Sequence, residues 1–181
     1  QVDRRCGGGV QSIATAAMMV QTGMADCVVA GGVESMSNIE YYSTNMRKGA
    51  RAGTVQFYDR LDRGRERSQP VERFGKISGM IETAENLARE YQISRDEADE
   101  YAVRSHQRAV AAWSEGKFAE EIVPVAVPQR KGDPVMFDTD EGYRSDASMD
   151  VLGALKPLMK DGTVTAGNSS QQNDAAAACL V

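Results

Sequence analysis

The stretch Asp3-Arg4-Arg5-Cys6-Gly7-Gly8-Gly9-Val10 sets a cysteine before three glycines, at the point where an apolar-periodic run begins. This pattern predicts a thiol at the first turn of a helix, where unpaired N–H groups and the positive end of the helix dipole favour a thiolate. The glycines leave the backbone beside the sulfur open to a ligand. Cys6 is therefore a candidate nucleophile; the alternative on this pattern alone is a buried, inert structural cysteine.

The residues that follow predict a layered α/β core. Apolar residues from Cys6 to Gln21 form a helical stripe that widens to nearly all round, so we expect a buried helix that ends at Thr22-Gly23. Ala25 to Ala30 is a short apolar run closed by Gly31-Gly32, as is typical of a strand buried on both faces. Val33 to Ser37 would then follow the carboxyl end of that strand, where α/β folds commonly place ligand-contacting loops.

Composition narrows the class of protein. The chain has 181 residues, 41% of them apolar and 26% charged, with a net charge of -5, so it is long enough for a sizeable core and carries no overall charge suited to nucleic acid or an anionic membrane. Its three cysteines, Cys6, Cys27 and Cys179, are widely spaced without a CxxC pair, which argues against disulfides and zinc and favours a reducing, cytoplasmic setting. No signal peptide or membrane span is apparent, and both chain ends look cut, since each lies inside a motif or an apolar run.

Residues 40 to 76 predict a long excursion from the core, because they are rich in Lys and Arg and show little periodicity. The basic side chains could hold a phosphate-bearing ligand, but we favour a solvated or subunit-contacting surface. They are Arg47, Lys48, Arg51, Arg63, Arg65, Arg67, Arg73 and Lys76.

Two helices are predicted next. The first runs from about Met80 to Glu90, and the second opens at the capping box Ser94-Arg95-Asp96-Glu97 and stops at Gly116. We expect His106, the one histidine of the sequence, to be an exposed helical side chain rather than a functional group. The buried stripe expected on the second helix is Ala98, Tyr101 or Ala102, Ser105, Ala109 and Ala112 or Trp113.

The last third of the chain predicts smaller elements. Residues 122–127 and 135–137 are expected to form a hairpin, and a short helix is expected near Met149 to Leu155. The small and hydroxyl side chains of Gly162 to Ser170 favour a loop against which a ligand can lie, although a tight structural turn needs the same residues. Ala175 to Val181 is expected to be the next core strand.

Six motifs, in order along the chain, resemble those of the thiolases, the acyl-CoA acyltransferases. The resemblance implies a layered α/β thiolase-like core, of which this chain is part of the first half, with an inserted loop domain of helices and a small hairpin. Residues 1–40 would be core, 41–160 the loop domain and 161–181 the return to the core. The motifs are Asp3 to Gly9, Val28 to Ser37, Thr83 to Ala88, Ser94 to Glu97, Glu121 to Pro124 and Gly162 to Asn168.

The resemblance also implies roles for residues. Cys6 matches the nucleophile that carries the acyl group as a thioester, in reversible cleavage or formation of 3-ketoacyl-CoA in fatty-acid or related acyl-CoA metabolism. Ser170 matches a serine that contacts pantetheine, Met80 a methionine near the acyl pocket, and Arg144 an arginine near the nucleotide end of CoA. CoA and acyl-CoA would be substrates, and no metal or separate cofactor is implied. A homodimer or homotetramer is expected.

The resemblance has two limits. The family's Asn-Glu-Ala-Phe, Gly-His-Pro and glycine-flanked second cysteine do not occur in this sequence, so the chain alone is expected to be inactive and poorly stable. The alternative is therefore a non-catalytic acyl-CoA-binding or assembly subunit. In addition, Gly79-Met80-Ile81 replaces the His-Met-Gly of many biosynthetic members, and Ser169-Ser170-Gln171-Gln172 replaces their Ala-Ser-Gly, which leaves room for a longer or bulkier acyl chain.

Overall fold

The computed structural model describes residues 1–63, 70–74 and 79–181. The chain divides into two compact units. The first unit consists of Gln1–Arg73 together with Gln172–Val181, and the second of Phe74–Gln171. This division does not test the boundaries at 40 and 160 of the expected loop domain, which stay a prediction.

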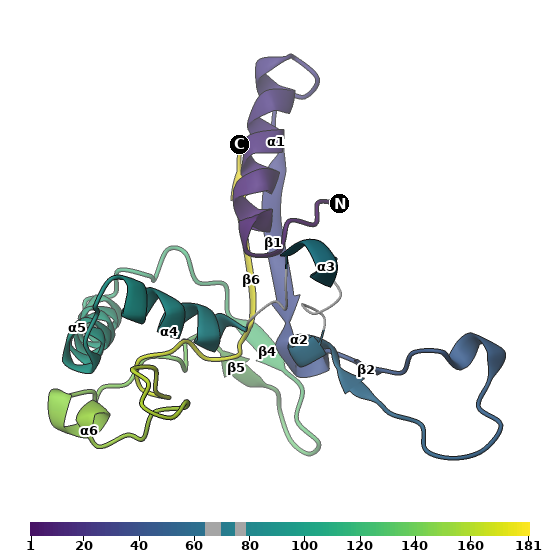
Figure 1. Cartoon of the computed structure of the whole chain (residues 1–181). Helices are drawn as coiled ribbons and strands as arrows, with labels where there is room; N and C mark the ends of the chain where they lie inside the picture. The colour runs from purple at the N-terminus through teal and green to yellow at the C-terminus, as the bar shows by residue number, and fades with distance from the viewer. Residues whose placement is uncertain (64–69, 75–78) are drawn as a thin grey trace. The chain divides into compact units, whose positions relative to one another are not determined.

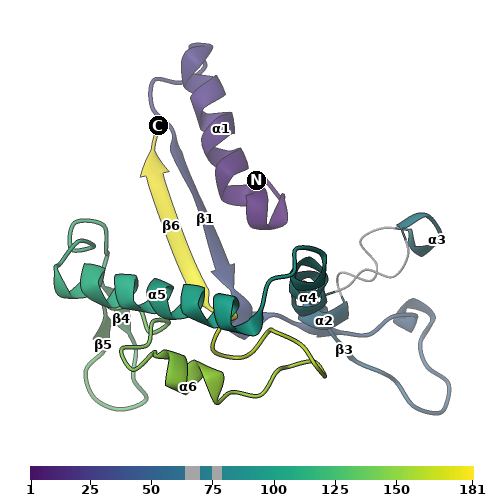
Figure 2. The same ribbon diagram turned by 60° about the vertical axis from the view of Figure 1, so that its left-hand side comes forward.

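One helix and a two-stranded sheet form the centre of the first unit. Strands β1 (Val29–Ser35) and β6 (Asp174–Leu180) pair antiparallel, from Val29 opposite Leu180 to Ser35 opposite Asp174. Helix α1 (Gly8–Gln21) runs beside β1, as both ribbon views show (Figure 1, Figure 2). At the far end of the pair the Asp174 carboxylate accepts bonds from the Ser37 amide, 2.9 Å, and from the Ser37 hydroxyl, 2.6 Å. These bonds lower the pKa of Asp174.

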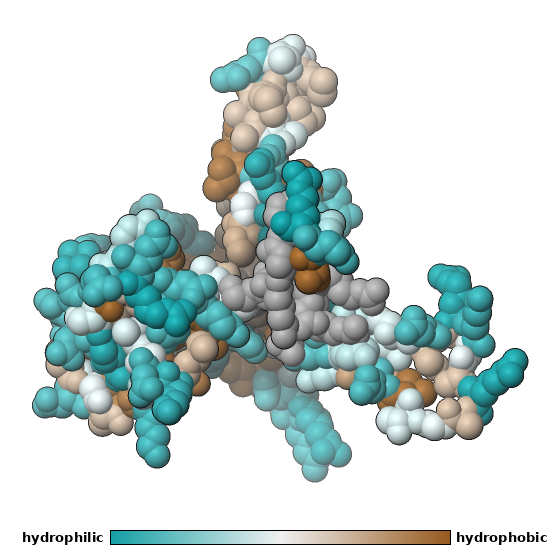
Figure 3. Space-filling view, in the orientation of Figure 1, coloured by the Kyte–Doolittle hydropathy of each residue, from teal (hydrophilic) through white to brown (hydrophobic). Residues whose placement is uncertain are grey.

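Two predictions for this unit are wrong. The strand after α1 covers Val29–Ser35 instead of residues 25–30, so Gly31 and Gly32 lie inside it and do not close it. Neither the helix nor the strand is buried all round: Ala16 is 2% exposed, but Val10 is 75% and Val33 79% exposed. Among the described residues of this unit, α1 packs mainly on β1 and buries the face toward that strand, so apolar residues remain visible over α1 in Figure 3.

Short elements occupy the rest of the first unit, in agreement with the predicted lack of periodicity. Strands β2 and β3 pair antiparallel, Tyr42 opposite Tyr58, and their rings lie 5.9 Å apart. Arg47, Lys48 and Arg51 are exposed, as the surface interpretation of this basic segment predicts. The side chain of Arg63, and all of Arg65, Arg67 and Lys76, lie outside the described residues. The elements are η1 (Arg5–Gly7), η2 (Met36–Asn38), β2 (Tyr41–Tyr42), η3 (Met46–Lys48), β3 (Tyr58–Asp59), α2 (Arg60–Arg63) and α3 (Val71–Phe74).

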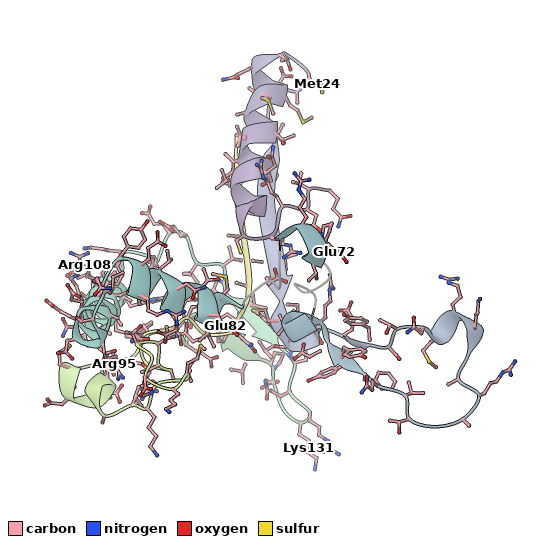
Figure 4. The ribbon with its side chains drawn as sticks, viewed as in Figure 1. Met24, Glu72, Glu82, Arg95, Arg108 and Lys131 are labelled. Carbon is pink, nitrogen blue, oxygen red and sulfur yellow. The ribbon has the colours of Figure 1, made fainter. Side chains whose placement is uncertain are left out.

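Helices α4, α5 and α6 and a hairpin make up the described part of the second unit. The capping box of α5 is confirmed: the Ser94 hydroxyl accepts the Glu97 N–H while the Glu97 carboxylate accepts the Ser94 N–H at 2.8 Å. Helix α6 packs against α5, with Val103, Ala147 and Leu152 forming a small core. Lys131 lies at the tip of the hairpin (Figure 4). The elements are α4 (Met80–Glu90), α5 (Arg95–Ser114), β4 (Val125–Val127), β5 (Val135–Phe137) and α6 (Met149–Gly153).

The buried face of α5 agrees with the predicted stripe in part. Ala98, Ala102 and Ala109 are half-buried, as predicted, and Ala102 packs against the small core. Ser105 and Tyr101 are exposed, Tyr101 by 66%, and the fully buried residues are Asp99 and Val103. The predicted stripe left out Asp99, whose carboxylate has a partner elsewhere in the unit. His106 lies on this covered face and is half-buried, so its predicted exposure is also wrong.

Two kinds of structure are absent from the described ranges. Among the helices of residues 1–63, 70–74 and 79–181, none has the length and apolarity needed to cross a bilayer. Within those same ranges no cluster of His, Cys, Asp and Glu side chains is arranged to hold a metal ion.

The close approach of β6 to Gly31 generates a first prediction. A Cβ at position 31 would lie 2.6 Å from the Ala177 carbonyl oxygen and 3.0 Å from the Ala178 Cβ, so Gly31→Ala is expected to lower the free energy of unfolding by about 1–3 kcal/mol. Gly32→Ala is the matched control, because a Cβ there meets nothing within 4 Å. Urea unfolding measures both, and equal effects of the two substitutions would contradict the assigned register.

Candidate functional site

Cys6 lies in the 3-10 turn η1, directly before α1, which begins two residues later than predicted, at Gly8. Its thiol is free and exposed, as are those of Cys27 and Cys179, so the alternative of a buried cysteine is wrong for this unit. A Cβ built at Gly8 or Gly9 meets nothing within 4 Å, which leaves the first turn of α1 open beside the sulfur. The position can thus present a thiol to an incoming carbonyl group.

The backbone of this turn is strained. Arg5 has a φ of 49°, in the left-handed region that residues with a Cβ seldom adopt. Neighbouring contacts hold the turn: the Gly7 N–H donates to the Arg4 carbonyl at 3.0 Å, and the Arg4 guanidinium donates to the Gln11 side chain on α1. Strain of this kind persists where surrounding contacts impose it and is frequent at functional sites.

A groove of about 750 Å³ runs between α1 and the sheet and reaches the segment that carries Cys6. Gly8 and Ser12 line it from the helix side, and residues of both strands line the opposite side. The Ser12 hydroxyl is within hydrogen-bond distance of the Gly9 carbonyl on its own helix, 3.0 Å, and of the Gly31 carbonyl on β1, 3.4 Å. Cys6 does not belong to the lining, which places its sulfur outside this groove.

In the second unit, the buried Glu85 of α4 holds the start of the loop from Gly162 to Ser170. Its side chain is 6% exposed and accepts the N–H groups of Thr163, 2.9 Å, and Val164, 2.8 Å, as well as the Thr163 hydroxyl, 3.2 Å. Burial raises the pKa of this carboxyl, but the bonds from Val164 and Thr163 lower it by more, so the pKa lies below its ordinary value. The carboxylate is therefore charged near neutral pH and supports the loop.

A second buried carboxylate, Asp99 of α5, holds the middle of the same loop. It is 1% exposed and accepts the Asn168 amide at 2.8 Å and the Arg95 guanidinium at 2.6 Å. The Asn168 side chain also donates to the Thr163 carbonyl, 2.9 Å, and accepts the Thr165 N–H, 2.8 Å, so it bridges the loop from within. These partners fix the orientation of the amide group.

Arg95 links this network to α6. Its guanidinium donates to the carbonyl oxygens of Leu152, 2.6 Å, and Leu155, 3.1 Å, at the end of that helix (Figure 4). A cation suits this end of a helix, where carbonyl groups lack intrahelical partners. Both α5 and α6 are thereby joined to the loop through one buried carboxylate.

The expected ligand-binding residues occupy different positions in the second unit. Met80 is the first residue of α4 and is 66% exposed, and Ser170 is exposed at the end of the supported loop. Arg144 lines a pocket of about 370 Å³, whose other walls include residues of α6 and, next to Ser170, the side chain of Ser169. Met80 and Ser170 do not line this pocket. The roles of these three residues stay predictions.

Sequence reasoning did not single out Glu85, Asp99 or Asn168 as side chains that support the loop. A signal existed for two of them, because Glu85 and Asn168 belong to motifs that carry the resemblance. For Asp99 the available signal was its position four residues after Arg95 on a helix, a spacing at which opposite charges pair.

The chain is thus a mixed α/β protein with an exposed candidate nucleophile in its first unit. Its second unit contains a loop of small and hydroxyl residues that two buried carboxylates hold in place. Residues 1–181 match the family described as thiolase, N-terminal domain. The chain belongs to the thiolase family, which confirms the resemblance seen in its motifs.

Among the relatives, the acetyl-CoA acetyltransferase of Chromobacterium violaceum is 47% identical over 97% of this chain and 44% of its own length. The beta-ketoadipyl-CoA thiolase of Acinetobacter baylyi is 42% identical over 99% of this chain and 45% of its own length. The chain thus spans less than half the length of these curated relatives.

Solved structures confirm the predicted fold class. The acetyl-CoA acetyltransferase of Bacillus anthracis superposes with a TM-score of 0.85 and 42% identity, over 97% of this chain and 43% of that one. Human mitochondrial 3-ketoacyl-CoA thiolase in complex with CoA gives a TM-score of 0.82 and 37% identity, over 97% of this chain and 42% of that one. The layered α/β thiolase-like fold therefore holds for this chain.

The loop support generates a second prediction. Glu85→Gln is expected to lower the free energy of unfolding by about 1–3 kcal/mol near neutral pH, because an amide replaces a charged acceptor of several bonds. Glu82→Gln, an exposed change on the same helix (Figure 4), is the control and should cost under about 0.5 kcal/mol.

The pH dependence of this difference has a definite sign. The pKa of Glu85 is lowered in the folded state, so its stabilisation is present above the unfolded value of about 4.3 and is lost as pH falls through the folded value. The gap between wild type and Glu85→Gln, measured by urea unfolding across acidic pH, should close in that window. A gap that widens on acidification would argue against the charged carboxylate.

Proposed function

We propose that this chain is the nucleophile-bearing part of a thiolase-type acyltransferase that cleaves or forms 3-ketoacyl-CoA. The observation that carries the proposal is the free, exposed Cys6 on a strained turn directly before α1, in a chain that matches the thiolase N-terminal domain throughout. The names of the relatives, acetyl-CoA acetyltransferase and beta-ketoadipyl-CoA thiolase, support the same reaction class.

The proposed cleavage of 3-ketoacyl-CoA proceeds in two steps. The Cys6 thiolate bonds to the keto carbon of the substrate, and the carbon–carbon bond to the acetyl-CoA fragment then breaks. The electron pair leaves on that fragment, which takes up a proton and departs as acetyl-CoA. The thiol of a second CoA gives up its proton and attacks the acyl-cysteine, which yields the shortened acyl-CoA and returns the thiolate of Cys6.

The N–H groups at the start of α1 are proposed to stabilise charge in these steps. An oxyanion forms when sulfur adds to the carbonyl, and a backbone N–H directed at it contributes a few kcal/mol in typical enzymes. The groups that activate sulfur and move protons are proposed to come from the part of the longer protein that carries the family's Gly-His-Pro motif and second cysteine.

We propose that Arg144, Ser170 and Met80 contact CoA, at its nucleotide, its pantetheine and near the acyl group respectively. The Arg144 guanidinium makes a two-point pair with Asp146, with both N–O distances 3.0 Å, which orients the cation and raises its pKa. Its remaining N–H groups are available to a phosphate. Gln171, where many biosynthetic members have glycine, supports a substrate other than acetoacetyl-CoA.

The proposal extends to the location, the oligomeric state and the metabolic context of the protein. The absence of a CxxC pair supports a reducing, cytoplasmic location, and the apolar residues exposed on α1 and β1 support assembly into a homodimer or homotetramer. Fatty-acid or related acyl-CoA metabolism is the proposed context.

Acyl transfer to Cys6 is the third prediction. Incubation of the full-length protein with acetyl-CoA or a 3-ketoacyl-CoA should add the acyl mass to the peptide that contains Cys6, and Cys6→Ala should abolish this label and turnover. The peptides of Cys27 and Cys179, the other two thiols of the chain, serve as internal controls. CoA binding without an acyl label would support the alternative of a non-catalytic acyl-CoA-binding subunit.

A further inference from the structure

The segment from Glu141 to Asp146, which carries Arg144, contains no helix or strand to hold it. Its ion pair between Arg144 and Asp146 lies within the segment, so the pair orients the guanidinium without fixing the backbone. The backbone position must therefore come from other contacts.

Side chains from outside the segment, on α5 and at Gln171, hold its backbone in position. His106, on α5, accepts the backbone N–H of Arg144 at its Nδ1 atom, 3.1 Å away. The Gln171 amide donates to the Gly142 carbonyl. Between these two points the Tyr143 ring stacks on Trp113, with centroids 6.1 Å apart and an interplanar angle of 21°. The segment is held on both sides of Arg144.

The contact with Arg144 uses His106 as an acceptor. A backbone N–H can only donate, so Nδ1 of the imidazole accepts in this contact. A leucine at this position would fill similar space and offer no acceptor.

The Gln171 carboxamide lies close to the position that a side chain at Gly142 would take. A Cβ built at position 142 would lie 3.2 Å from the Gln171 amide nitrogen, so a larger residue would press on the carboxamide. His106, Arg144 and Gln171 also line the same pocket of about 370 Å³. The two side chains that hold the segment thus stand at the pocket where Arg144 is presented.

We propose that His106 and Gln171 are positioning residues that hold Arg144 in place for the phosphate-bearing end of CoA. The inference rests on the proposed function, in which Arg144 contacts that end. His106 acts through the backbone of Arg144, and Gln171 acts through the carbonyl two residues earlier. Neither side chain is assigned a contact with the reacting atoms.

The test compares CoA with pantetheine, which lacks the nucleotide, in calorimetric titrations of the full-length protein. His106→Leu and Gln171→Leu should each weaken CoA binding by roughly tenfold, the effect of one lost hydrogen bond to a positioned group, and leave pantetheine binding unchanged. His106→Asn is the matched control, because its side-chain oxygen can replace Nδ1 as acceptor and should restore most of the affinity.

A double-mutant cycle with Arg144→Ala separates positioning from a general structural role. In the Arg144→Ala background, His106→Leu should have no further effect on CoA binding, because no guanidinium remains to be positioned. An equal loss for CoA and pantetheine, or a His106→Leu effect that persists without Arg144, would overturn the inference. Unchanged CoA binding by both leucine variants would overturn it too.

The same titrations distinguish failure of the proposed function. If the wild-type protein binds CoA no more tightly than pantetheine, the role of Arg144 at the nucleotide fails, and the positioning role fails with it. If wild type prefers CoA and neither leucine variant weakens that preference, the positioning inference alone fails.

Discussion

Two buried carboxylates, Glu85 on α4 and Asp99 on α5, determine the arrangement of the second unit. A buried charge is costly unless hydrogen bonds compensate it, and here the compensating groups are N–H donors of the Gly162 to Ser170 loop and the Arg95 guanidinium. The loop therefore depends on the helices for its conformation, and the helices depend on the loop to satisfy their charges. A ligand that lies along this loop meets a surface whose polar groups are already fixed, which reduces the ordering cost of binding.

The two units use different physical means to present their functional groups. In the second unit, polar contacts between residues far apart in sequence hold the loop, for example Glu85 and Thr163. In the first unit, Cys6 is placed by the local turn that precedes α1, with Arg5 in a left-handed conformation and few contacts beyond the neighbouring residues. A thiol that must react with successive substrates benefits from an open approach, whereas a loop that contacts a long, flexible ligand benefits from rigidity.

Local signals in the sequence predicted the elements that depend on local interactions. The α4 bounds, the Ser94 capping box and the strand from Val135 to Phe137 were all predicted, because propensity, capping and turn chemistry act over a few residues. The bounds of β1, the buried face of α1 and part of the buried face of α5 were not, because they depend on which partner covers each face. Glu85 and Asp99 would pass for surface charges in the sequence, since their loop partners lie 78 and 69 residues away. The predicted exposure of His106 was wrong for the same reason, because its partner Arg144 lies 38 residues away in the sequence.

Gln171 shows how a departure from a family pattern acquires a physical meaning. Many biosynthetic thiolases have glycine where Gln171 stands, and glycine has no side chain with which to reach Gly142. In this chain the carboxamide makes that contact and lines the pocket that Arg144 also lines. Position 171 therefore affects both the width of the pocket and the fixation of the Arg144 segment, through one side chain. Because Arg144 is proposed to contact the nucleotide end of CoA, and Met80 near the acyl group does not line this pocket, a change of residue 171 is expected to act here on CoA affinity.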